Sequence, residues 1–105
     1  MGVKLFVSAE EAEAKVPIGT MKLLLVRGQS FNLVHMEAGF VATNDSCPHM
    51  HEPLHKGSLN AFNEVICPLH HYRFNLITGQ ESNNRCQDLK IYPVNITPDG
   101  VFLEI

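Results

Sequence analysis

Two short boxes of cysteine and histidine carry the most evident chemistry in this chain. The first is Cys47-Pro48-His49 and the second is Cys67-Pro68-Leu69-His70, with residues 50–66 between them. Each box offers one thiolate and one imidazole, which soft and borderline metals select. A single C-x-H triplet is more often a buried free cysteine beside a solvated histidine, but two boxes together predict a metal centre. Its predicted ligands are Cys47, His49, Cys67 and His70.

The proline after each cysteine supports this interpretation. Proline fixes its own φ and lacks a backbone donor, so Pro48 and Pro68 stiffen the tips of two loops. Loops, unlike helices, can bring both tips to one centre. The same four ligands could instead hold structural zinc in a tetrahedral Cys2His2 site, which remains the main alternative at this stage.

A second motif overlaps the first box. His51-Glu52-Pro53-Leu54-His55 matches H-E-x-x-H, in which two histidines one helical turn apart bind zinc. Pro53 disfavours a helix there, so we interpret the match as coincidence and the histidines as solvated loop residues. The sequence assigns no role to His51, His55, His71 or Cys86, although we expect Cys86 to be a small strand-edge residue. His35, which alternates with Leu33, is expected to be exposed.

Short apolar runs separated by turn residues predict the elements that position these boxes. Strands are expected at 3–7, 22–26, 31–36, 40–43, 88–95 and 101–105. Ser8-Ala9-Glu10-Glu11 predicts the start of one short helix that ends before Pro17. We therefore expect an all-β protein, an antiparallel sandwich or small barrel with one short helix.

The predicted ligands fall in a segment of different character. Residues 44–85 contain five of the 6 histidines and two of the 3 cysteines, among Pro, Asn and Gly. We interpret this segment as a metal-binding insert within a single domain of residues 1–105.

Composition limits the classes of function. A chain of 105 residues has room for one core, and its net charge of -3 comes without a basic stripe, so nucleic acid is not an expected partner. The sequence has no apolar run of about 18 residues and no signal-peptide pattern. Three cysteines fit a disulfide framework poorly. We expect a cytoplasmic monomer that binds no membrane and has proteins as partners.

The boxes and their surroundings resemble the Rieske proteins, and among them the soluble Rieske ferredoxins. The similarity covers residues 40–105 and includes Pro53-Leu54, Gly57, Phe74, Thr78-Gly79 and 89–94 (LKIYPV). The resemblance implies a Rieske-like fold with a cluster-binding loop subdomain. It also implies a 2Fe-2S cluster in which Cys47 and Cys67 hold one iron and His49 and His70 the other. Residues 70–74 (HHYRF) are also similar to the animal Rieske-domain-containing proteins.

The function that this resemblance implies is one-electron transfer, from a reductase to a terminal oxygenase or similar acceptor. The chain would then be an electron-transfer component and not itself an enzyme. The small Rieske-like subunit of a reductase such as nitrite reductase is a further alternative. Met50, Pro68 and Leu69 are apolar residues expected at the tip, where they are candidates for a protein-docking patch.

Two departures from the family pattern have consequences. Many members have glycine at the positions of His51 and His71, so the loop backbone is expected to differ or to be strained there. High-potential members carry a disulfide, a serine and a tyrosine near the cluster. This chain has Glu52, Leu69, Tyr72 and Phe74 at those four positions, which predicts a low reduction potential.

Overall fold

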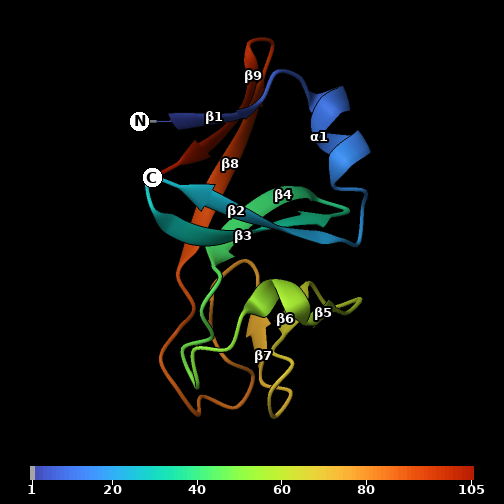
Figure 1. Ribbon diagram of the computed structural model, residues 1–105. Helices are drawn as coiled ribbons and strands as arrows, with labels where there is room; N and C mark the ends of the chain where they lie inside the picture. Colours follow the sequence, from blue (N-terminus) through green and yellow to red (C-terminus); the bar gives the residue numbers. More distant parts are fainter. Residues whose placement is uncertain (1) are drawn as a thin grey trace.

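The computed structural model describes residues 2–105 as two antiparallel sheets and one α-helix (Figure 1). The six-stranded sheet has the spatial order β1-β9-β8-β4-β3-β2. In that order its strands are Gly2–Phe6, Gly100–Glu104, Ile91–Thr97, Gly39–Asn44, Gln29–Met36 and Met21–Val26. The three-stranded sheet contains β5 (Ser58–Leu59), β6 (Glu64–Ile66) and β7 (Arg73–Asn75). The expected all-β class with one short helix is confirmed.

The helix α1 (Ala9–Lys15) begins where the sequence predicts. The Ser8 side chain accepts a hydrogen bond from the Glu11 backbone N–H at 3.1 Å, and the Glu11 carboxylate accepts one from the Val7 N–H at 3.2 Å. These bonds satisfy donors that a helix start leaves unpaired. Ala12 faces a core cluster with Phe6, Leu33, Phe40, Val16 and Val101, so α1 covers one part of the large sheet.

The prediction for His35 was wrong. Its side chain is buried, its Nδ1 donates to the Val16 carbonyl at 2.6 Å, and its ring stacks on Phe40 with 3.9 Å between centroids. Residues 31–36 of β3 are all buried, because other parts of the chain cover both faces of this strand. A period-two pattern reports exposure only when one face of a strand meets solvent.

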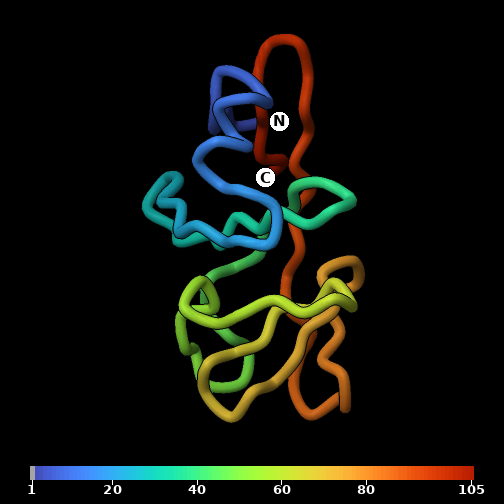
Figure 2. The backbone as a smooth tube through the Cα atoms, turned by 90° about the vertical axis from the view of Figure 1, so that its right-hand side faces the viewer, coloured from blue at the N-terminus to red at the C-terminus, as the bar shows by residue number. Residues whose placement is uncertain are grey.

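The segment after β4 forms a second layer beneath the large sheet. It contains the 3-10 helix η1 (Leu54–Lys56), the small sheet and three loops, and Figure 2 shows two of these loops side by side at the lower end. The chain termini lie in the other half of the molecule, beside the large sheet, where Gly2 pairs with Glu104. A buried cluster joins the two layers and includes Val34, Val41, Leu54, Val65, Phe74, Leu89 and both box cysteines, Cys47 and Cys67. Within the described residues, no helix has the length and apolar character needed to cross a membrane.

Candidate metal centre

The two boxes lie on loops that are closed in the same way. The Cys47 N–H donates to the Glu52 carbonyl at 3.0 Å, and the Cys67 N–H donates to the Tyr72 carbonyl at 2.8 Å. In each loop the cysteine therefore bonds the residue five positions further along the chain. This shared closure turns both loops back on themselves and directs both boxes to the same end of the molecule.

The family glycine positions have the backbone that glycine favours. His51 has φ 59° and His71 has φ 57°, so both are left-handed, as is His70 at φ 64°. A side chain in this conformation costs roughly 1–2 kcal/mol per residue. The loops therefore keep the turn and retain strain, which is the second of the two outcomes expected from the sequence.

The two box cysteines are neighbours in the core. Both are fully buried, and their thiols interact with one another. The pKa of the Cys67 thiol is raised to about 11, first by burial and then by the neighbouring Cys47, although a hydrogen bond from the Leu69 backbone N–H lowers it. A thiol held protonated at neutral pH must release its proton when it binds a metal.

The two box histidines lie beside each other, further out than the cysteines. His49 is half-buried and His70 is exposed, with ring centroids 5.4 Å apart. The Nδ1 atom of His49 is buried and has no hydrogen-bond partner among the described residues. A buried ring nitrogen without a partner is costly unless it binds something, so this atom fits the role of a metal ligand.

The structure adds two residues that the sequence did not single out for this site, Arg85 and Glu81, and connects them to Tyr72, which the sequence had placed near the cluster. The Tyr72 ring stacks on His49, with centroids 3.9 Å apart and 9° between the planes, and the Arg85 guanidinium lies 3.7 Å from the Tyr72 centroid. Arg85 is bound to the buried carboxylate of Glu81 at 2.8 Å. Hydrogen bonds from Arg85 lower the pKa of Glu81 to about 2, although burial of the carboxylate by itself would raise it. The spacing of Glu81 and Arg85 was visible in the sequence, but nothing in it connected them to Tyr72.

The H-E-x-x-H match is confirmed as a coincidence of sequence. Only Leu54–Lys56 is helical, and His51 lies in a left-handed turn before it. The His55 backbone N–H and Nδ1 each donate to the Asp45 carboxylate at 2.7 Å. Ser46 Oγ and His51 Nδ1 share a hydrogen bond of 3.0 Å. These contacts hold the first box to the end of β4.

The remaining loop residues differ in their positions. Cys86 is half-buried and packs on the core cluster that contains Cys47 and Cys67, but it lies in an irregular segment and not at a strand edge, so that prediction was wrong. Burial, with Cys47 nearby, raises the pKa of its thiol. Met50 is 52% exposed and Pro68 is exposed, as expected at a tip, whereas Leu69 is half-buried.

The arrangement of donors is not that of a compact single-ion site. Among residues 2–105, no three His, Cys, Asp or Glu side chains are arranged around one metal position. Tetrahedral zinc needs four donors around one ion. A two-iron cluster divides the thiolates and imidazoles between two metal atoms, and buried cysteines with an outer pair of histidines suit that division.

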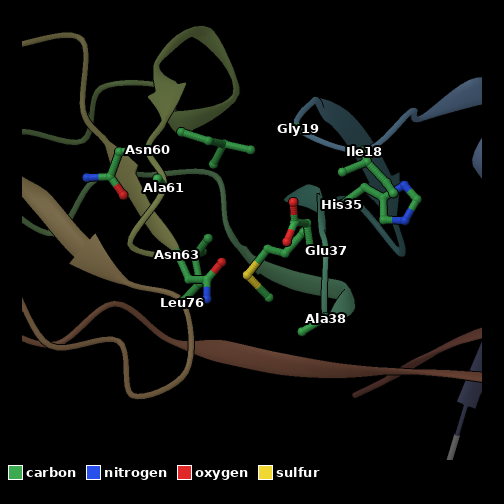
Figure 3. A pocket seen from close by; sticks show the side chains of 11 residues that line it. Ile18, Gly19, His35, Glu37, Ala38, Asn60, Ala61, Asn63 and Leu76 are labelled. Atoms are coloured by element: carbon green, nitrogen blue, oxygen red, sulfur yellow. The ribbon is translucent and has the colours of Figure 1, made fainter.

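A groove of about 760 Å³ lies away from the boxes (Figure 3). It runs between the β3–β4 turn and residues 59–63, and its lining includes Ile18, His35, Glu37, Asn60, Asn63 and Leu76. None of the four predicted ligands lines it.

Comparison with known proteins agrees with this geometry. A model of the Rieske [2Fe-2S] domain matches residues 6–93, and the chain belongs to the Rieske [2Fe-2S] domain family. Its cofactor is accordingly a Rieske-type 2Fe-2S cluster.

Similar proteins include the ferredoxin component of a naphthalene 1,2-dioxygenase system from Pseudomonas aeruginosa, 30% identical over 87% of this chain and 88% of the relative. The ferredoxin component of the 2,4-dinitrotoluene dioxygenase system from Burkholderia sp. (strain RASC) is 33% identical over 90% of each chain. Among solved structures, the ferredoxin of carbazole 1,9a-dioxygenase from Nocardioides aromaticivorans IC177 has a TM-score of 0.82 at 21% identity, covering 99% of this chain and 97% of the other.

Proposed function

We propose that this chain is a Rieske ferredoxin, a one-electron carrier of a dioxygenase-type system. Cys47 and Cys67 bind one iron of its cluster, and His49 and His70 bind the other. The observation that supports this most directly is the buried, unpartnered Nδ1 of His49, beside the exposed His70 and outside the two buried thiols.

Each part of the site has a separate task. The bound cluster supplies one-electron redox chemistry, at a potential raised by two neutral imidazoles in place of anionic thiolates. Cys47 and Cys67 are fully buried and would keep water away from the iron that they bind. The Leu69 N–H donates to the Cys67 sulfur and so stabilises its negative charge. His70 is exposed and offers the shortest path from the site to a partner surface.

The partners in this proposal are a reductase that donates electrons and a terminal oxygenase that accepts them. Two relatives support this proposal, because they are 30% and 33% identical to this chain and are ferredoxin components of dioxygenase systems. Met50, next to His49, and Pro68, two residues before His70, are exposed and would contribute to docking. The proposal includes a single domain over residues 1–105 with its metal-binding insert at 44–85, a monomeric state, and a cytoplasmic location, which suits three cysteines that form no disulfide.

Metal and sulfide analysis of ligand variants tests the proposed site. The purified protein is expected to contain two iron and two acid-labile sulfide per chain. Cys47→Ser, Cys67→Ser, His49→Ala and His70→Ala should each abolish or strongly reduce that content. His71→Ala, beside His70 on the second loop, is the matched control and should keep it. One zinc per chain, or full cluster content in a ligand variant, would contradict the assignment.

Electron transfer tests the role. The chemically reduced protein, mixed with the terminal oxygenase of a dioxygenase system and its aromatic substrate, should be reoxidised faster than with bovine serum albumin. Equal rates in the two mixtures, with each available oxygenase, would contradict the carrier role while leaving the ligand assignment intact.

A further inference from the structure

Three side chains from separate parts of the chain form a column that ends on His49. The Tyr72 ring lies parallel to the His49 ring within 9°, at a centroid distance of 3.9 Å. The Arg85 guanidinium carbon lies 3.7 Å from the Tyr72 centroid. Tyr72 ends the second box loop, whereas Arg85 lies in the segment between β7 and β8. The column therefore connects a ligand on the first loop to two further segments.

The far end of the column is firmly held. The Glu81 side chain is fully buried, and its carboxylate accepts from the Arg85 backbone N–H at 2.7 Å, from Nε at 3.1 Å and from Nη2 at 2.8 Å. Glu81 itself is fixed by an isolated bridge to Phe74, at the centre of β7. A guanidinium bound through two nitrogens has a defined plane, which a flexible ammonium would lack.

Burial of the Glu81 carboxylate is costly, and Arg85 is the cation that compensates for it. The paired guanidinium remains on the face of Tyr72, where the negative ring face favours a cation. Its positive charge is about two ring spacings from His49, a distance comparable with the ~8 Å screening length at physiological salt. The Glu81 carboxylate offsets part of this charge, and the remaining positive field favours an added electron at the site over the oxidised form.

We propose that Tyr72 and Arg85, anchored by Glu81, are positioning residues for His49 that fix the orientation of its ring and raise the reduction potential of the site. This inference rests on the proposed function, because it requires His49 to be a cluster ligand. Neither Tyr72 nor Arg85 is a ligand in this proposal.

The test uses the holoprotein and compares Arg85→Gln and Arg85→Met with Arg73→Gln. Arg73 is the matched control, since it is also an exposed arginine near the second box but pairs with Glu64 at 4.0 Å. Each variant is first analysed for iron and sulfide, and the ratio of reduced to oxidised protein is then measured at one fixed ambient potential.

Both Arg85 variants should lower the ratio of reduced to oxidised protein about threefold or more relative to wild type. A tenfold change of this ratio corresponds to a shift of about 59 mV in the potential of a one-electron couple. Arg73→Gln should change it less than twofold, and Arg85→Lys, which keeps the charge, should recover most of the loss. The claim that Arg85 raises the reduction potential would be overturned by either of two results. One is an equal change of the ratio in Arg85→Gln and Arg73→Gln; the other is an unchanged ratio in an Arg85 variant that retains its cluster. Either Arg85 variant alone suffices if the other does not fold.

Ring orientation has its own measurement. In the reduced protein, the pulsed-EPR couplings of the histidine nitrogens should change in Tyr72→Leu and remain in Tyr72→Phe, which keeps the ring. Unchanged couplings in Tyr72→Leu would overturn the positioning part. Full cluster content in His49→Ala would instead show that the proposed ligand assignment had failed, so the two failures are distinguishable.

Discussion

Gly79 is the position where a single methyl group should most affect this fold. Its φ is +82°, and a Cβ built there would lie 2.0 Å from the Leu89 carbonyl oxygen. The two segments cannot separate freely, because the Leu89 N–H donates to the Gly79 carbonyl at 2.7 Å. Leu89 also packs in the core cluster with Cys47 and Cys67. Gly79→Ala must therefore either break this bond or displace a wall of the metal site.

Two costs add in this substitution. Alanine in the left-handed region costs roughly 1–2 kcal/mol, and overpacking against a fixed neighbour costs about 1–3 kcal/mol. A total of about 3 kcal/mol would lower the unfolding midpoint of a domain of this size by roughly 12–24 °C.

Other glycines separate the two costs. Gly28 has φ +78° with no atom within 4 Å of a built Cβ, so Gly28→Ala tests the backbone cost alone. Gly57 has φ −83° and a Cβ that would lie 2.0 Å from the Ile66 carbonyl oxygen, so Gly57→Ala tests the close contact alone. The assay is thermal unfolding of the three holoproteins by circular dichroism at one scan rate. If Gly79→Ala lowers the midpoint no more than Gly28→Ala, the argument from close approach is refuted.

Three further predictions concern the helix start, the buried ion pair and the cluster. Ser8→Ala should cost about 1 kcal/mol in urea unfolding, because the Glu11 N–H loses its acceptor, while Ser8→Asp should restore most of it. Glu81→Gln should destabilise the protein by about 2 kcal/mol at neutral pH. Since folding lowers the pKa of Glu81 from 4.5 to about 2, the difference between wild type and Glu81→Gln in urea midpoint should be constant above pH 6 and should shrink as pH falls from 4.5 toward 2. A difference that grows on acidification would contradict this sign. The reduction potential should lie toward the lower end of the Rieske range, near about −150 mV, and a redox titration with a midpoint well above zero would contradict the prediction.

Local signals in the sequence accounted for much of the architecture. The strand runs and the helix start at Ser8 depend on neighbouring residues, and the structure has them within a few positions of the prediction. The largest shift is in β8, which begins at Ile91 and not at residue 88. The two boxes were also readable, because proline and metal-ligand residues at short spacing form a local pattern.

Burial could not be predicted from such patterns where distant segments meet. His35 is buried because the chain covers both faces of β3. Cys86 packs beside the box cysteines although it is distant from both in sequence and lies on no strand.

The chemistry of this protein therefore has two origins. Residue types and spacing by themselves determined which cysteines and histidines are candidate ligands, because ligand chemistry belongs to individual side chains. Only the tertiary structure decided that His49 has a buried, unpartnered nitrogen, that Tyr72 stacks against its ring and that Arg85 lies on the Tyr72 ring. Contacts of that kind depend on how three separated segments pack, and no spacing within one segment encodes them.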